Sequence, residues 1–132
     1  MEITYHTDRI PDAPQIAALF RSSGIRRPVD DLPRIEQMFA HANLVISAWA
    51  GDELIGIARS LTDFCYCCYL SDLAVRKEYQ RAGVGRRLIA LTQEQIGPRT
   101  ALILLSAPAA MAYYPRVGFE KTDNAYIIKR SE

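Results

Sequence analysis

The spacing of apolar residues predicts one strand and two helices in the first third of the chain. Ile3 and Tyr5 alternate with polar neighbours, which is typical of a short first strand. From Asp12 onward, apolar residues recur at helical spacing up to Phe20, and aspartate is a common residue at a helix start. Helical spacing returns over residues 31–42, after a break that contains glycine and proline.

Beyond residue 42 the pattern is mostly that of strands. It predicts three successive strands, a long helix, a strand, a short helix and a last strand, at residues 44–50, 53–61, 65–75, 83–96, 101–107, 109–114 and 125–130. The run ALILLSA at 101–107 is almost wholly apolar, as expected for a strand buried on both faces. The order βααβββαβαβ therefore predicts a single α/β domain, residues 1–132, around one central sheet.

Composition narrows the classes of partner. The 132 residues are 49% hydrophobic and carry a net charge of only +1, so no face that binds nucleic acid is expected and any anion site must be local. No apolar run reaches the roughly 18 residues that span a bilayer, and the opening MEITYHTDR does not resemble a signal peptide. We therefore expect a cytoplasmic protein with no membrane partner.

Three cysteines are crowded into the strand predicted at residues 65–75. Cys65 and Cys67 would share one face of that strand and Cys68 the other, so the three thiols cannot easily converge. His6 and His41 are far away in the sequence, so a four-ligand zinc site is not expected either. We interpret the cysteines as small buried residues of a central strand, in preference to a covalent acyl-cysteine relay.

The stretch YQRAGVGRR indicates a local anion site at the start of the long helix. It lacks the lysine of a Walker loop and the third glycine of a dinucleotide-binding loop. Gly83 and Gly85 would let the backbone approach a pyrophosphate, which the free N–H groups and the dipole of the helix start favour. Arg81 and Arg86 would add positive charge. The alternative is a glycine-tolerant helix start with solvated arginines.

Two segments resemble conserved parts of one enzyme family. SDLAVRKEYQRAGVGRRLI, in which Gln80, Gly83 and Gly85 are in register, resembles the acyl-CoA-binding core of the GNAT N-acetyltransferase superfamily. APAAMAYYPRVGF resembles the short helix of that family, with its aromatic-Tyr pair followed by Gly-Phe. The resemblance implies a GNAT-type single domain, with a twisted, mixed and mostly antiparallel sheet and helices on both faces. It also implies acetyl-CoA as cosubstrate and direct transfer of an acetyl group to a primary amine in a ternary complex.

The resemblance assigns roles to particular residues. The strand end that would pair with the pantetheine arm consists of Leu73, Ala74 and Val75. The loop that would hold the pyrophosphate consists of Gln80, Arg81, Ala82, Gly83, Val84, Gly85 and Arg86. Tyr113 would pack against the cofactor or the core. Tyr114 would be the catalytic residue that protonates the departing thiolate, or else a core aromatic residue with a structural hydrogen bond.

Two features depart from the family pattern. Many members have an asparagine where this chain has Ala107, so one contact to pantetheine must be lost or made by backbone. The general base is unassigned: the candidates are Asp72, His41 and Asp63, and attack by an already neutral amine is the alternative.

The acceptor, a small-molecule or peptide amine, would lie against the two N-terminal helices. Arg26 and Arg27 in the intervening loop would recognise an acidic acceptor or be plain exposed charges. A non-catalytic acyl-CoA-binding or regulatory module is the rival function. A homodimer through a sheet edge or the terminal strand is compatible with this pattern.

Overall fold

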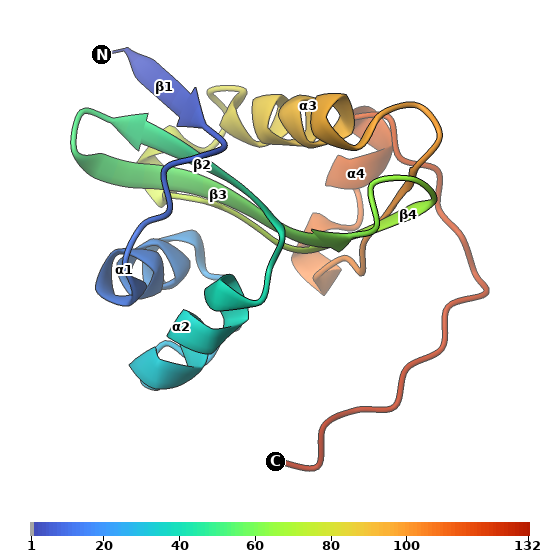
Figure 1. The fold of residues 1–132 in the computed structure, drawn as a ribbon, viewed down its shortest axis with the longest axis horizontal. Helices are drawn as coiled ribbons and strands as arrows, with labels where there is room; N and C mark the ends of the chain where they lie inside the picture. The colour runs from blue at the N-terminus through green and yellow to red at the C-terminus, as the bar shows by residue number, and fades with distance from the viewer. Residues whose placement is uncertain (1) are drawn as a thin grey trace.

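The computed structural model describes residues 2–132 and contains one five-stranded sheet with helices on both faces (Figure 1). The elements are β1 (Ile3–His6), α1 (Ala13–Ser23), α2 (Leu32–Ala40), β2 (Leu44–Ala50), β3 (Glu53–Thr62), β4 (Cys67–Val75), α3 (Val84–Ile96), β5 (Ala101–Ile103) and α4 (Tyr113–Arg116), with 3-10 turns at Lys77–Tyr79 and Pro108–Ala110.

The strands lie in the order β1-β2-β3-β4-β5, and every neighbouring pair is antiparallel except β4 and β5, which are parallel. Helices α1 and α2 lie on one face of the sheet and α3 on the other (Figure 1). Each face has its own apolar core. Phe20, Ile35 and Trp49 belong to the core under α1 and α2, and Ile46 and Leu88 to the core under α3. The predicted single mixed domain is thus observed.

Local sequence signals fix where α1 and α2 begin and end. Asp12 caps α1 by accepting a hydrogen bond from the Gln15 backbone, and the Gln15 side chain accepts one from the Asp12 backbone in return. The helix ends at Gly24, whose φ of +82° lies in the left-handed region. Asp31 caps α2 through the backbone N–H of Arg34. The break between the helices is therefore encoded by caps at both of its ends.

Close packing sets the height of α3 above the sheet. A Cβ atom on Gly56 of β3 would lie 3.0 Å from Val84 Cγ1 and 3.2 Å from Leu88 Cδ1. The glycine therefore lets the first turns of α3 approach the sheet closely. As a result, the start of α3 is held beside the end of β4, where the predicted anion site begins.

The C-terminal part of the chain differs from the sequence prediction. Residues 125–130 form no strand; they run away from the body of the protein, and the side chains of Tyr126 and Ile128 are 98% and 99% exposed (Figure 1). Strand β5 is only Ala101–Ile103, shorter than the predicted 101–107, and Ile103 is half-exposed. The physical reason is that, within residues 2–132, no strand pairs with the outer edge of β5. Residues 101–107 are accordingly exposed or only half-buried, so the apolar run is not buried on both faces.

The cysteine prediction is wrong for two of the three residues. Cys65 in the turn before β4 and Cys67 at the first position of β4 are exposed, and only Cys68 is buried. The turn carries them beyond the part of the sheet that helices cover. Adjacent Cys67 and Cys68 do face opposite sides, as predicted, and all three thiols are free. Among the described residues no group of side chains could hold a metal ion, and no helix is long and apolar enough to cross a membrane.

Candidate active site

The candidate site lies where the pairing between β4 and β5 ends. The two parallel strands pair only at Cys67–Tyr69 with Ala101–Ile103, and β4 then continues alone on that side to Val75. Beyond Tyr69, no strand in the described part of the chain pairs with this edge of β4. This unpaired edge of β4 exposes a row of backbone N–H and C=O groups that an amide-bearing ligand could pair with.

The side chains at the end of β4 serve packing. Ala74 is buried in the core under α1 and α2, whereas Leu73 and Val75 are half-buried against the core under α3. Because these side chains point into the protein, the three residues offer a ligand mainly their backbone.

The loop after β4 has an unusual backbone. Arg81 and Gly83 both have positive φ angles, +74° and +81°, and Gly83 is the N-cap of α3. No side chain within residues 2–132 caps this helix start. The backbone N–H groups of Val84, Gly85 and Arg86 in the first turn therefore lack acceptors in the helix. Such uncapped donors, together with the helix dipole, are suited to bind an anion.

The side chains of the loop have separate roles. The Gln80 amide donates a hydrogen bond to the Val75 carbonyl at 3.0 Å, which ties the loop to the strand end. Val84 is fully buried beneath α3 and can offer a ligand only backbone atoms. The Arg86 guanidinium donates to the carbonyl of Arg116 at 3.3 Å. Arg81 and Ala82 are exposed, so the Arg81 side chain is free to meet an anion.

Gly85 makes room for Tyr113. A Cβ atom on Gly85 would lie 2.7 Å from the Tyr113 hydroxyl oxygen, so this glycine permits a close approach of α4 to α3. Burial raises the pKa of Tyr113, and the nearby Arg86 guanidinium opposes that effect. The two segments that carried the family resemblance are thus in direct contact.

Tyr114 is held by aromatic packing on both sides. Its ring makes edge-to-face contacts with Tyr113 and Phe119, at centroid distances of 5.3 and 5.4 Å. No hydrogen bond involving its hydroxyl occurs within residues 2–132, so nothing there assigns the hydroxyl a structural role. Burial is the main factor that raises the pKa of Tyr114; Tyr113 adds to it and the Arg27 guanidinium opposes it. The phenol is therefore protonated at neutral pH and able to donate a proton.

A buried ion-pair cluster lies on the α1–α2 side of β4. The Asp72 carboxylate is fully buried and pairs with two guanidinium groups: Arg27 Nε is 2.5 Å from Oδ1, and Arg59 Nε donates to Oδ2. Arg27 also donates to the Ser71 carbonyl, and Arg59 donates to the Ser71 hydroxyl and to the carbonyl of Met38. The cluster therefore ties the α1–α2 loop and the end of α2 to the sheet.

This cluster changes two readings of the sequence. Both oxygens of Asp72 are engaged by guanidinium groups, so Asp72 is unsuited to act as a general base. Arg27 is not an exposed loop charge, because its side chain is only 26% exposed and pairs with a buried carboxylate. The sequence analysis missed Arg59; the one signal for it was a charged residue within the apolar run ELIGIARSL.

The other two base candidates lie in exposed positions. Asp63 accepts hydrogen bonds from three backbone N–H groups of the turn that leads into β4, and these bonds hold its pKa well below the usual range. His41 is exposed at the C-terminal end of α2. A carboxylate with so low a pKa is a weak proton acceptor.

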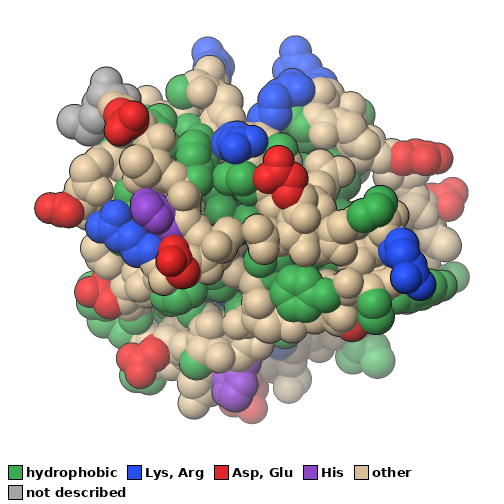
Figure 2. Space-filling model, turned by 45° about the horizontal axis from the view of Figure 1, so that its top comes forward, with side chains coloured by type: hydrophobic (Ala, Val, Ile, Leu, Met, Phe, Trp, Pro, Cys, Tyr) green, Lys and Arg blue, Asp and Glu red, His purple; other side chains and the backbone are tan. Residues whose placement is uncertain are grey.

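Surface shape and charge add two observations. In Figure 2, several Lys and Arg side chains gather at the top of the view on either side of a notch lined by apolar side chains, although the net charge is only +1.

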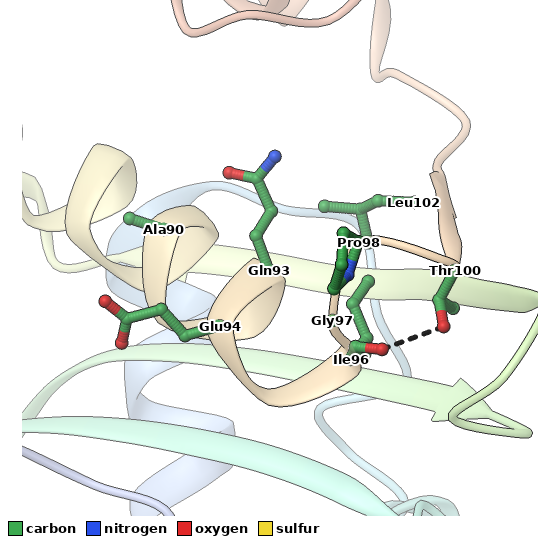
Figure 3. A pocket seen from close by; sticks show the side chains of 8 residues that line it. All are labelled: Ala90, Gln93, Glu94, Ile96, Gly97, Pro98, Thr100 and Leu102. Atoms are coloured by element: carbon green, nitrogen blue, oxygen red, sulfur yellow. Dashed lines mark hydrogen bonds between the residues drawn. The ribbon is translucent and has the colours of Figure 1, made fainter.

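A cavity of about 640 Å³ lies at the C-terminal end of α3, lined by residues such as Gln93, Ile96 and Leu102 (Figure 3). That cavity is at the opposite end of α3 from Gly83, so it does not belong to the candidate active site.

Comparison with known proteins agrees with this geometry. A family model described as an acetyltransferase (GNAT) domain matches residues 20–129. A search of curated protein sequences finds no match. A Staphylococcus aureus protein of unknown function, described as a probable acetyltransferase, has a similar structure, with a TM-score of 0.82, 22% identity and coverage of 98% of this chain and 100% of that one.

Two further structures show the same fold. A GNAT-family acetyltransferase from Streptococcus pneumoniae superposes with a TM-score of 0.73 at 22% identity, covering 98% of this chain and 100% of that one. An aminoglycoside N-acetyltransferase in complex with CoA superposes with a TM-score of 0.70 at 18% identity, covering 98% and 94%. Because the family model covers most of the chain, the protein belongs to the GNAT acetyltransferase family.

Proposed function

We propose that this protein transfers an acetyl group from acetyl-CoA directly to a primary amine in a ternary complex. The observation that carries the proposal is the unpaired edge of β4, which ends beside the uncapped start of α3. Membership of an acetyltransferase family, and a structural neighbour determined with CoA, support acetyl-CoA as cosubstrate.

The residues present fit this cosubstrate. The backbone of β4 at Leu73, Ala74 and Val75 would pair with the amides of the pantetheine arm. The N–H groups at the start of α3 would bind the pyrophosphate, and Arg81 would add a positive charge. Gln80 would act indirectly, because its side chain already fixes the loop to Val75.

The chemistry needs one proton donor. Acetyl-CoA supplies a thioester; the amine nitrogen forms a bond to its carbonyl carbon, and the carbon–sulfur bond breaks. Tyr114 would donate its phenolic proton to the departing thiolate sulfur. The raised pKa of Tyr114 keeps its hydroxyl group protonated and so available for this step. The proton that the amine loses would pass to water, because the geometry favours none of the three base candidates.

The acceptor would enter on the α1–α2 side of the sheet. Asp72 holds the Arg27 guanidinium in place on that side, and the positive charge of Arg27 acts electrostatically on Tyr114. The acceptor would be a primary amine on a small molecule or peptide; the aminoglycoside N-acetyltransferase of the same fold supports a small molecule. The free, exposed thiols of Cys65 and Cys67 support a reducing compartment such as the cytoplasm.

The test is thiol release from acetyl-CoA across a panel of primary amines. Tyr114→Phe should lower kcat by about 10²-fold while leaving CoA affinity near normal, because only a proton donor is lost. Tyr66→Phe is the matched control, since Tyr66 is an exposed tyrosine in the turn before β4. Unchanged turnover in Tyr114→Phe would remove its proposed role. CoA binding without turnover on any amine would favour the rival, a non-catalytic acyl-CoA-binding module.

A further inference from the structure

An exposed row of apolar side chains crosses three strands of the sheet. Leu61 of β3 pairs in register with Tyr69 of β4, and Tyr69 pairs with Ile103 of β5. Register partners on adjacent strands share a face of the sheet, so the three side chains form one continuous row. Their exposed fractions are 43%, 40% and 49%. Single exposed apolar residues are ordinary, whereas contiguous ones mark a binding surface.

The row lies on the α1–α2 side of the sheet, next to the buried ion-pair cluster. Leu61 is two residues beyond Arg59 on β3, and Tyr69 is two residues before Ser71 on β4, so each shares a face with that neighbour. Arg59 donates a hydrogen bond to the Ser71 hydroxyl, which places both of them on the same side. The row and the cluster therefore form one surface on the proposed acceptor side.

The row also marks the point where β4 loses its neighbour. Tyr69 and Ile103 are the last residues of β4 and β5 that pair, and the free edge of β4 runs from there to Val75. If the pyrophosphate binds at the start of α3 beside Val75, the pantetheine arm has to follow this edge toward Tyr69. The acyl end of the cosubstrate would then be the part nearest to the row.

The charges beside the row oppose a second cation on the acceptor. The cluster has two guanidinium groups, those of Arg27 and Arg59, for the one carboxylate of Asp72, so one positive charge is in excess. In the turn after β3, Oδ1 of Asp63 accepts hydrogen bonds from three backbone N–H groups, and Oδ2 accepts one from the Cys67 thiol at 3.8 Å. Both carboxylates are therefore already paired, and a second ammonium group on the acceptor would meet the excess positive charge.

We propose that the acceptor is a monoamine whose amino group is carried on an apolar alkyl or aryl-alkyl body, and that this body lies on Leu61, Tyr69 and Ile103. The inference rests on the proposed acetyl transfer and adds the class of acceptor to it. Apolar surface of the acceptor leaves water against the row, which favours binding. A polycationic acceptor is rejected by the guanidinium groups. By the same reasoning an aminoglycoside, which carries several amino groups, would be a poor acceptor.

The test compares ethylamine, hexylamine and 1,6-diaminohexane in the thiol-release assay at saturating acetyl-CoA. Their amino groups are primary and of similar basicity, and the amines differ in apolar length or in a second cation. Burying one CH2 group is worth about fourfold in affinity, so the longer chain of hexylamine, half-buried on the row, should raise kcat/KM roughly tenfold above that of ethylamine. For 1,6-diaminohexane, kcat/KM should fall back to the level of ethylamine or below, despite its two amino groups.

The possible failures of this comparison are distinguishable. If ethylamine or 1,6-diaminohexane is acetylated as fast as hexylamine, the acceptor class is wrong and the proposed acetyl transfer stands. If no amine, in this set or in the wider panel, releases thiol, the proposed acetyl transfer is wrong and this inference falls with it.

Substitutions at Ile103 test the row itself. Ile103→Ser should lower kcat/KM for hexylamine about threefold, and should leave that for ethylamine and the KM for acetyl-CoA unchanged. Ile103→Glu should reverse the preference in favour of 1,6-diaminohexane, because a carboxylate on the row attracts the second ammonium group. Tyr69→Ser, on the neighbouring strand, should lower the ratio of hexylamine to ethylamine in the same sense, and it replaces the Ile103 variants if these do not fold.

Ile10→Ser is the matched control, because Ile10 is 55% exposed and lies in the connection between β1 and α1, away from the row. Its ratio of kcat/KM for hexylamine to that for ethylamine should equal that of the unaltered protein. A purely structural role of Ile103 would lower the rates with all three amines equally, and that result contradicts the proposal. An unchanged ratio in Ile103→Ser and Tyr69→Ser would mean that the acceptor does not touch the row.

Discussion

Tyr114 is the residue whose environment most directly sets a measurable pH dependence. Burial raises its pKa above the usual value near 10. The folded protein therefore favours the neutral form of Tyr114. The contribution of Tyr114 to the free energy of unfolding is fully present below the pKa that it has in the unfolded chain. That contribution is lost as the pH rises through the pKa that Tyr114 has in the folded protein. Loss of kcat through ionisation of Tyr114 is expected only above about pH 10.

The check is a pH–rate profile at saturating amine, together with an ultraviolet titration of the phenolate groups. In that titration, the Tyr114→Phe variant should lack one of the tyrosines that ionise at the highest pH. An alkaline loss of activity centred well below pH 9 that disappears in Tyr114→Phe would contradict the raised pKa. A group that titrates there in both proteins would instead be assigned to the acceptor amine.

At the same scale, the sequence predicts some functional positions and not others. The place of Tyr114 follows from a local motif, because the aromatic pair and Gly-Phe lie within a few residues of each other. The pairing of Asp72 with Arg27 and Arg59 joins residues 45 and 13 positions apart. Which charges meet across such distances depends on the packing of α1 and α2 on the sheet, and no local pattern reports that packing.

At the scale of elements, the start of α3 gives a test with a close internal control. Gly83 and Gly24 have nearly the same φ, +81° and +82°, and at neither would a Cβ atom have a described neighbour within 4 Å. Alanine at either position should therefore cost a similar backbone strain of about 1 kcal/mol in the free energy of unfolding. Only Gly83→Ala should also lower CoA affinity, because only Gly83 borders the proposed pyrophosphate site.

Denaturant unfolding and calorimetric titration with CoA measure the two effects separately. Equal destabilisation, with a CoA affinity about tenfold weaker in Gly83→Ala than in Gly24→Ala, is the expected outcome. If both variants bind CoA equally well, the loop does not hold the pyrophosphate and the helix start is merely glycine-tolerant.

The sequence predicts the helices and strands correctly where a segment with an apolar pattern is also buried in the folded protein. The strands β2, β3 and β4 and the helix α3 lie close to the predicted ranges, because each buries a continuous apolar face in the same chain. The strands predicted at 101–107 and 125–130 have strand patterns but lack burial. A sequence pattern records that a segment is suited to a sheet; it does not record whether the rest of the chain covers that segment.

At the scale of the whole molecule, the Asp72 cluster joins the α1–α2 layer to the sheet. It connects the α1–α2 loop through Arg27, the end of α2 through the Met38 carbonyl, and strands β3 and β4. The layer that would form the acceptor side of the site is therefore fixed to the strand that would bind the cosubstrate. Disturbing the cluster should loosen the acceptor side more than the cosubstrate side.

Asp72→Asn removes the carboxylate charge and leaves two guanidinium groups without their partner. Breaking a buried ion pair from one side costs about 3–5 kcal/mol, so the free energy of unfolding should fall by that amount. In the folded fraction, the KM for the amine should rise by roughly an order of magnitude, whereas the KM for acetyl-CoA stays nearly constant. Arg27→Gln, which releases only the loop, should reproduce the change in KM with a smaller loss of stability.

Asp30→Asn is the matched control, because Asp30 lies in the same loop and pairs with Arg21 at the surface, where its side chain is 98% exposed. Exposed pairs contribute little, so neither the stability nor either KM should change. A selective rise in the KM for the amine in the two cluster variants, absent in the control, would show that the buried charges position the acceptor side. A rise in the KM for both substrates would mean that the cluster supports the sheet as a whole, and the assignment of the acceptor to the α1–α2 side would lose its support.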